Sequence, residues 1–185
     1  MNKSDYELVF SYLSGDSESL EILIRSYLKP IYSFTYRYVG NSQDAEDIAQ
    51  ETFVKVWRHL KRFDQSKSFK TWIFSIAKNT AIDFLKKKKV ISFSDFDTED
   101  GGNIIADTFA DMAKSSQEIF ERKETAQMFE SAMAELSPKY RMVLSLRYNN
   151  DFNFREIAET LGESINTVKS RYRRALIMLK NLFNK

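Results

Sequence analysis

Glycine and proline are scarce in this chain, and this scarcity constrains the fold more than any other feature of the sequence. Only 5 glycines and 2 prolines occur in 185 residues, which is too few for a turn-rich β fold, where these residues mark the turns. Hydrophobic residues (43%) and charged residues (29%) occur in the proportions of a soluble globular protein. The sequence therefore predicts an all-α fold.

The chain has no cysteine and one histidine, His59, and this excludes several kinds of site. Disulfides and thiolate metal sites need cysteine, and a lone histidine argues against a zinc enzyme or a histidine-centred triad. No Gly-rich phosphate loop is present. The longest uninterrupted apolar run, Ala175–Leu179, is too short to cross a bilayer, and the N-terminus lacks an apolar signal core. We expect a cytoplasmic protein that is not an enzyme and has no metal, cofactor or small-molecule substrate.

The net charge of +2 conceals a strong segregation of charge along the chain. Residues 1–90 carry a balance of +4, residues 91–135 a balance of −8, and residues 136–185 a balance of +6. Two basic segments flanking an acidic one indicate two modules that meet a polyanion, separated by a segment that repels it. Solvated helix faces of mixed sign are the alternative interpretation.

Apolar residues at helical spacing, with helix-start and helix-stop residues between them, divide the chain into two helical modules and a tether. We predict modules at 1–90 and 121–185 and a flexible acidic linker at 91–120. In the first module, the predicted helices run from Asp16-Ser17 to Gly40, from Asn41-Ser42 to about Phe63 and from Ser68 to Lys89. Pro30 is expected to kink or interrupt the first of these. The remaining predicted helices run from about Gln117 to Leu136 and over Pro138–Tyr148, Phe154–Leu161 and Ile165–Leu182.

The last two helices have the dimensions of a helix-turn-helix. Ala158 is small where the helices cross, Gly162 suits the left-handed turn, and Ser164 caps the second helix. The predicted buried stripe of that helix is Ile165, Val168, Tyr172, Leu176 and Leu179. Its outer face carries groups that reach base edges and phosphates in a major groove: Asn166, Lys169, Ser170, Arg173 and Arg174. Helical hairpins often have basic outer faces, but crossing residues, cap and basic face together indicate DNA binding.

Three segments in and before this hairpin resemble region 4 of bacterial sigma factors, and the extracytoplasmic-function (ECF) group is the most similar. The segments are Leu136–Tyr148, Phe154–Gly162 and Thr167–Leu176. The resemblance implies that this module reads the −35 promoter element. The recognition positions would be Thr167, Lys169, Ser170, Arg173 and Arg174, with Asn166 beside them.

The predicted third helix, Asp44–Arg58, carries an anionic stripe. Asp44, Asp47 and Glu51 share one face, with Gln50 beside them, and a solvated acidic surface is the default interpretation. The segment also resembles sigma region 2.2, whose Asp-x-x-Gln-Glu pattern is matched by Asp47, Gln50 and Glu51. The resemblance implies that these residues dock on a coiled coil of the RNA polymerase β′ subunit. We expect Ile48, Phe53 and Trp57 to face the core.

The predicted fourth helix interleaves aromatic residues with lysines, as single-strand binding surfaces do. These residues are Phe69, Trp72, Phe74, Lys70 and Lys78, followed by Asn79. The helix is similar to sigma regions 2.3 and 2.4, which implies that it recognises the −10 element. The loop Asp64–Ser68 would then hold an extruded base.

Within this segment, some side chains are assigned to DNA and others to the core. The residues assigned to the −10 element are Ser66, Lys67, Lys70, Lys78 and Asn79, whereas Trp72, Ile73 and Ile76 favour the core. Lys86–Lys89 is predicted to be a general phosphate patch, with a solvated helix end as the alternative.

The resemblance extends over residues 8–89 and 121–183. It implies an alternative sigma factor that binds core RNA polymerase through the β′ coiled coil and the β flap, directs it to promoter DNA and assists DNA opening. An anti-sigma factor is the regulatory partner that the family implies. The alternative function is a stand-alone two-domain helix-turn-helix regulator that binds DNA without polymerase.

Overall fold

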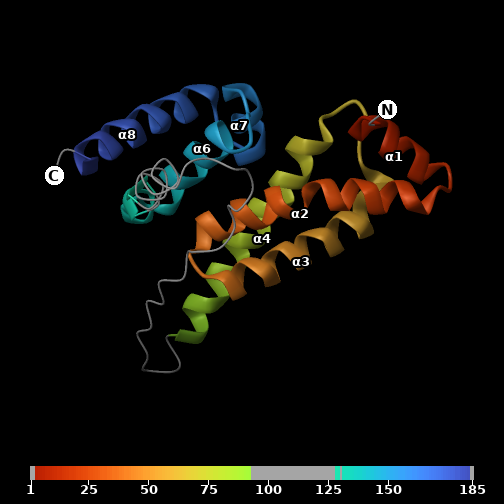
Figure 1. Cartoon of the computed structure of the whole chain (residues 1–185), viewed down its shortest axis with the longest axis horizontal. Coiled ribbons are helices and arrows are strands. Elements are labelled where there is room, and N and C mark those ends of the chain that lie inside the picture. Colours follow the sequence, from red (N-terminus) through yellow and green to blue (C-terminus); the bar gives the residue numbers. More distant parts are fainter. Residues whose placement is uncertain (1–2, 93–127, 130, 184–185) are drawn as a thin grey trace, which may run out of the picture.

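The structure is a computed structural model that describes residues 3–92, 128–129 and 131–183 (Figure 1). The N-terminal half contains α1 (Asp5–Leu13), α2 (Ser17–Val39), α3 (Ser42–His59), the 3-10 turn η1 (Leu60–Arg62) and α4 (Phe69–Ser92). The C-terminal half contains α6 (Pro138–Tyr148), α7 (Phe154–Leu161) and α8 (Ile165–Phe183). The described residues include no β-strand, so the all-α class is confirmed.

Residues 93–120 of the predicted acidic linker, and most of the helix expected from Gln117, lie outside the described residues. The linker was predicted to begin at residue 91, but α4 continues to Ser92. Within the described ranges, no helix is long and apolar enough to cross a membrane. No three His, Cys, Asp or Glu side chains are grouped there in a way that would hold a metal ion.

Helices α2, α3 and α4 pack around one apolar core, and α1 lies against α2. Phe34 of α2 and Phe74 of α4 meet edge to face at its centre, with ring centroids 5.2 Å apart. Other fully buried side chains in this core are Leu23, Ile31, Ile48, Val56, Leu60 and Ile73. The core fixes the orientation of α3 and α4, so it determines which faces of these two helices point outward.

Helix α2 is continuous through Pro30, so of the two effects expected there, a kink or an interruption, the interruption is wrong. Proline inside a helix removes one backbone hydrogen bond and costs about 3 kcal/mol or more. Tyr27 and Ile31, on either side of Pro30, are both buried in the same core. Packing on both sides of the proline therefore keeps the helix intact, and Asp16 and Gly40 cap its two ends as predicted.

Helix α1 was not predicted from the sequence, although a local signal marks its start. Ser4 and Glu7 form a capping box: the Ser4 hydroxyl accepts a hydrogen bond from the Glu7 N–H, and the Glu7 carboxylate accepts one from the Ser4 N–H. Leu8 and Val9 are buried against the rest of the bundle. A helix of nine residues is marginal alone, so this packing stabilises it.

Helices α7 and α8 form the predicted hairpin. Gly162 lies between them with φ of 68°, the left-handed conformation that glycine adopts without strain. Ala158 is buried where the helices cross. Helix α6 begins at Pro138 as predicted, but the Ser137 side chain makes no capping hydrogen bond.

The buried stripe of α8 differs from the prediction at two positions. Val168 and Leu179 are buried as expected, but Ile165 and Leu176 are 38% and 37% exposed. Ala175 is fully buried instead. Positions 168, 172, 175 and 179 follow the spacing of a single helix face, and Ile165 and Leu176 lie at its edges.

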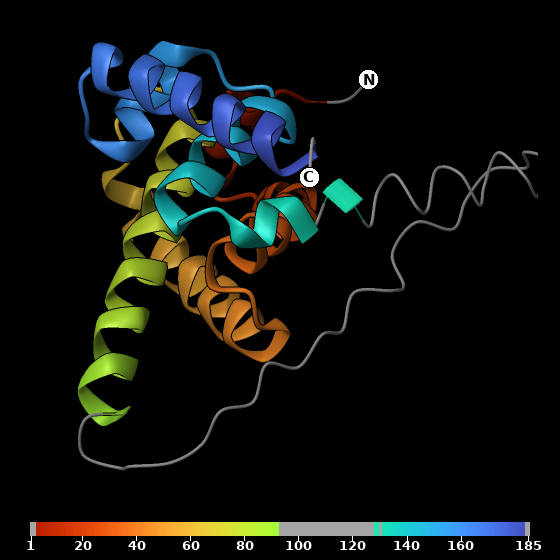
Figure 2. The ribbon, with the colours of Figure 1, turned by 90° about the vertical axis from the view of Figure 1, so that its left-hand side faces the viewer.

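The two halves of the molecule pack directly on each other. Helix α6 lies against α2, and α7 lies against α4 (Figure 1). One apolar cluster runs through both halves and joins Phe74 of α4 to Phe152, the residue before the α7 cap. Figure 2 shows that the C-terminal end of α4 projects away from this packed region. The sequence suggested two modules on a tether and contained no signal for this contact.

Replacing Asn153 by alanine should lower the free energy of unfolding by about 1 kcal/mol, the usual cost of losing an N-cap. Asn153 caps α7: its side-chain oxygen accepts from the Arg155 and Glu156 N–H groups, and the Glu156 carboxylate accepts from the Asn153 N–H. Urea unfolding followed by circular dichroism measures the change. Asn149→Ala is the matched control, because Asn149 is exposed and follows the last residue of α6. Equal losses in both variants would contradict the capping role.

Candidate nucleic-acid and protein interfaces

Helix α8 presents a broad basic face to solvent. Asn166, Thr167, Lys169, Ser170, Arg173 and Arg174 are all exposed. Asn166, Thr167, Ser170 and Arg174 line a hollow of about 400 Å³ between α8 and the start of α6. Lys169 and Arg173 do not line it, so the structure gathers four of the six predicted residues around one concavity.

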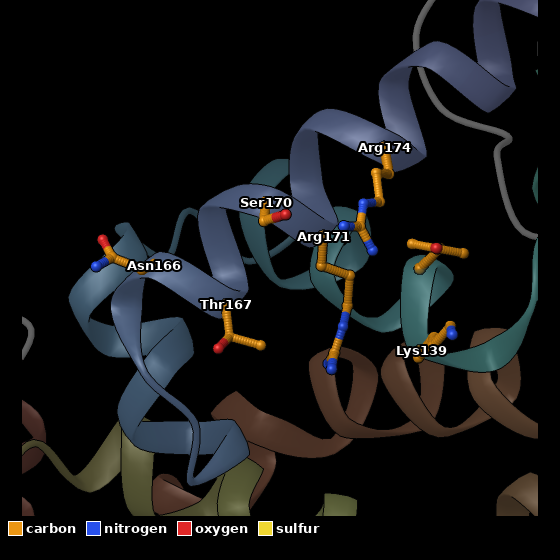
Figure 3. A pocket seen from close by; sticks show the side chains of 7 residues that line it. Lys139, Asn166, Thr167, Ser170, Arg171 and Arg174 are labelled. Atoms are coloured by element: carbon orange, nitrogen blue, oxygen red, sulfur yellow. The ribbon is translucent and has the colours of Figure 1, made fainter.

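Two further cations border this hollow and were not predicted. Lys139 approaches from α6, and Arg171 lies on α8 (Figure 3). Arg171 donates to the Glu163 carboxylate at 2.9 Å, which holds the turn against α8. Ser164 caps α8 through the Thr167 N–H, and the two hydroxyls are 2.8 Å apart. The turn and the helix start are thus fixed to each other, so the concavity has a defined shape.

Asp47 and Glu51 of the acidic stripe of α3 are exposed, whereas the Asp44 side chain is only 16% exposed, and part of the charge of the stripe is paired. Asp47 and Gln50 are exposed. Glu51 forms an ion pair with Lys55 at 2.8 Å, and Asp44 forms one with Lys88 of α4 at 2.7 Å. The Glu51–Lys55 pair lies at the surface, where such pairs contribute little to stability.

Two apolar side chains extend the exposed surface of α3. Trp57 is 58% exposed and Val54 is 43% exposed, so the expectation that Trp57 faces the core is wrong. Val56 and Leu60 fill the core positions of this turn and are fully buried, which turns Trp57 outward. Val54 follows Asp47 by seven residues and so lies on the same face. Acidic, amide and apolar groups therefore share one surface.

The loop before α4 is organised by Asp64. Its carboxylate accepts hydrogen bonds from the Ser66 N–H at 3.0 Å and the Ser66 hydroxyl at 2.7 Å. These bonds hold the pKa of Asp64 below its usual value. Ser66 and Lys67 are exposed on the loop.

A hollow of about 260 Å³ opens between this loop and α1. It is lined by Phe63, Gln65, Lys67, Ser68 and Phe69 on one side and by Ser4, Asp5, Tyr6 and Val9 on the other. Tyr6 is 60% exposed. The residues from α1 were missed by sequence reasoning, because nothing local links the chain start to a loop sixty residues away.

The predicted −10 residues on α4 differ in exposure, because the C-terminal half packs against some of them and not others. Asn79 is exposed, whereas Lys70 and Lys78 are half-buried. Lys70 donates to the Asn150 carbonyl, and Lys78 donates to the Leu161 carbonyl at 3.2 Å. Burial lowers the pKa of Lys78, and the nearby Glu163 carboxylate opposes this shift. Both lysines therefore contact the C-terminal half.

The aromatic residues of α4 do not form a free stacking surface in this arrangement. Phe69 and Phe74 are 4% and 0% exposed, so in this arrangement both rings belong to the core. Ile73 is buried as expected, and Trp72 and Ile76 are half-buried against the same core. The three consecutive lysines Lys86–Lys88 are exposed on the projecting end of α4, and Lys88 is the one paired with Asp44.

Comparison with known families identifies both halves of the chain. Sigma-70 region 2 matches residues 23–90, and Sigma-70, region 4 matches residues 126–179. The ECF RNA polymerase sigma factor SigW of Bacillus subtilis is 32% identical over 162 residues, covering 86% of each chain. The RNA polymerase sigma-H factor of Pseudomonas aeruginosa is 29% identical over 174 residues, covering 94% of this chain and 90% of the relative.

Two solved structures share the fold. CnrH in complex with the cytosolic domain of CnrY has a TM-score of 0.70 and 22% identity and covers 98% of both chains. The sigma factor RpoE of Bartonella quintana, in complex with the anti-sigma factor NepR, has a TM-score of 0.68 and 24% identity over 89% of this chain and 96% of that one.

The chain belongs to the extracytoplasmic-function family of RNA polymerase sigma factors. It is a sigma factor, a DNA-binding protein that directs RNA polymerase to promoters at transcription initiation. Membership in this family decides between the two functions that the sequence left open, in favour of the sigma factor.

Proposed function

We propose that the two family regions of this chain bind different promoter elements. Residues 1–90 bind core polymerase and the −10 element, and residues 121–185 bind the −35 element. The protein contributes no catalytic group of its own and acts in the cytoplasm, where the polymerase works. The observation that carries the proposal is the presence of both family regions, in order, over most of one chain.

The −35 role is supported by the basic face of α8. Amide, hydroxyl and guanidinium groups of α8 border a concavity, and α8 is the second helix of a helix-turn-helix, the helix that enters the major groove in such motifs. Lys139 adds a cation at the start of α6, which suits a phosphate on the flanking DNA backbone. Arg173 and Lys169 extend the cationic surface along α8.

The polymerase role is supported by the composition of the α3 surface. An exposed tryptophan is uncommon on a solvated surface and is enriched at the centres of protein interfaces. Trp57 lies on the same helix as the exposed Asp47, Gln50 and Glu51. Carboxylates beside apolar groups suit a basic partner surface such as the β′ coiled coil, while the β flap would meet the C-terminal module.

The −10 role is supported by the loop before α4 and the exposed Asn79. The hollow beside the loop has aromatic, amide and hydroxyl groups, the kinds of side chain that hold an extruded base. Tyr6 of α1 adds an exposed ring to that hollow. Lys67, Lys70 and Lys78 would follow the phosphates of the single strand.

An anti-sigma factor is the regulatory partner that we propose for this chain, as for other members of the family. Run-off transcription on a genomic promoter pool tests the whole assignment. Core polymerase with the protein should yield defined transcripts that core polymerase alone does not produce. Equal transcript patterns with and without the protein would refute the proposed function.

Replacing Lys169 or Arg174 by alanine should weaken binding to −35 duplex DNA. Loss of a base contact costs about 1–3 kcal/mol and relaxes specificity, whereas loss of a phosphate contact reduces the salt slope by about one. Fluorescence anisotropy at several salt concentrations separates the two effects. Lys180→Ala is the matched control, an exposed lysine further along α8 that does not border the concavity. If both variants kept the wild-type affinity and salt slope, the assignment of Lys169 and Arg174 to −35 binding would be wrong.

A further inference from the structure

Helix α1 exposes two aromatic side chains beside the hollow that lies between α1 and the loop before α4 (Figure 1). Tyr6 lines this hollow, and Tyr6 and Phe10 are both more than half exposed. The two residues lie at i and i+4, so they share one face of α1, with Cβ atoms about 5–6 Å apart. The core contacts of α1 come from Leu8 and Val9, which are buried. Packing of the helix therefore does not explain the two rings.

Helix α1 also lies outside the part of the chain that the family region matches. The match to Sigma-70 region 2 begins at residue 23, whereas α1 ends at Leu13. Single exposed apolar residues are common on protein surfaces, but apolar groups that gather in one place mark interaction sites. Tyr6 and Phe10 are neighbours on the helix face and border a hollow, so they form such a site.

The position of α1 against the hollow is fixed by Tyr27 of α2. The Tyr27 hydroxyl donates a hydrogen bond to the Asp5 carboxylate of α1. Burial raises the pKa of Tyr27, so the hydroxyl keeps the proton that it donates. The Tyr27 ring meets Phe69 edge to face at 5.4 Å, and Phe69 meets Phe63 at 5.7 Å. Phe63 and Phe69 line the hollow from the loop side, so one aromatic cluster holds both of its walls.

The charges around the two rings suit a nucleic-acid strand. Lys67, on the loop side of the hollow, is exposed. The two carboxylates of α1 have hydrogen-bond donors within the bundle: Asp5 accepts from Tyr27, and Glu7 accepts from the Ser4 N–H and hydroxyl. Aromatic rings beside an ammonium group are the arrangement that binds single strands, with bases on the rings and a phosphate at the cation.

We propose that α1 is a stacking platform for the displaced DNA strand, on which Tyr6 and Phe10 hold the bases next to the one extruded into the hollow. This inference rests on the proposed −10 role of the loop before α4. Because α1 forms one wall of the hollow, a base held there leaves its neighbours in the strand beside α1. Stacking on a ring tolerates any base, so the platform stabilises the separated strand, whereas the hollow selects the base.

Replacing both rings by leucine tests the platform. Tyr6→Leu with Phe10→Leu removes the aromatic planes and keeps apolar, helix-forming side chains. Holoenzyme formed with this variant is titrated with fork-junction DNA whose non-template −10 strand is single-stranded, built on a promoter recovered by run-off transcription. Binding should weaken roughly tenfold or more, the loss expected when stacked bases lose their rings. The matched control is Ile22→Ala with Leu28→Ala, two comparably exposed apolar residues of α2, which should keep the wild-type affinity.

Removing the bases one at a time locates the contact. In the wild type, an abasic site should weaken binding at the position held in the hollow and at the positions next to it. In Tyr6→Leu/Phe10→Leu, the loss at the adjoining positions should disappear, because the rings that those bases contact are already gone. The loss at the position held in the hollow should remain.

The outcomes separate the platform from the −10 role beneath it. Equal affinities and equal abasic profiles in the wild type and the leucine variant would overturn the platform and leave the −10 role intact. A wild-type profile without any loss across the −10 element would instead show that the −10 role itself is wrong. Weaker binding of the leucine variant to core polymerase without DNA would show that the rings contact protein, and this result would also overturn the inference.

Discussion

Reversing Asp47 and Glu51 to lysine should abolish binding to core polymerase while the protein remains folded. Both residues are exposed on α3, and exposed substitutions usually change stability by within about 0.5 kcal/mol. Against a basic partner surface, like charge costs several kcal/mol, on the order of a hundredfold or more in affinity. Co-purification with core polymerase and a titration by fluorescence anisotropy measure the loss.

Glu18→Lys with Glu21→Lys provides the matched control for this double reversal. These two carboxylates are exposed on α2, and Glu21 forms an i,i+4 ion pair with Arg25, as Glu51 does with Lys55. The control reverses the same amount of charge on a different surface and should keep polymerase affinity. Normal polymerase binding by Asp47→Lys/Glu51→Lys would refute the docking surface, even though the protein is a sigma factor.

Replacing Gln65 and Asn79 together by alanine should leave the promoter closed. The two side chains flank the part of α4 that we propose binds the single strand, and Asn79 is exposed. Losing two base contacts at about 1–3 kcal/mol each weakens −10 recognition on the order of a hundredfold. Permanganate footprinting of the holoenzyme on a promoter recovered by run-off transcription detects unpaired thymines. Binding to −35 duplex DNA should not change, because α8 is intact.

Asp83→Ala is the control for the opening defect. Asp83 is exposed one turn beyond Asn79 on the same helix, and its replacement keeps the loop unchanged. Wild-type permanganate reactivity in Gln65→Ala/Asn79→Ala would contradict a contact of either side chain with the −10 bases. A defect of equal size in Asp83→Ala would instead indicate a general effect of altering α4.

Helix ends were predictable because their signals are local. Asn41 accepts a hydrogen bond from the Asp44 N–H at 2.9 Å and begins α3, and Gly40 ends α2 in the left-handed conformation. Such caps need only a few neighbouring residues. The same rule would have found α1, because Ser4 and Glu7 form a complete capping box.

The buried side of each helix was less predictable than its ends. Phe53 and Trp57 were both expected to face the core, yet Trp57 is exposed and Val56 is buried. In α8, Ala175 takes a buried position that Leu176 was expected to hold. Adjacent apolar residues differ by only 100° around a helix, so the neighbouring helix decides which of them is covered.

The sequence by itself determined the helical class, the two regions and the polar side chains that α8 exposes, since periodicity, caps and local motifs encode these features. Tertiary structure alone decided the state of Lys70 and Lys78. Their partners, the Asn150 and Leu161 carbonyls, lie eighty residues or more along the chain, and backbone carbonyls carry no sequence signal. Lysines that resemble free phosphate ligands in the sequence are thus engaged by the C-terminal half, because the shared core around Phe74 and Phe152 brings the two halves together.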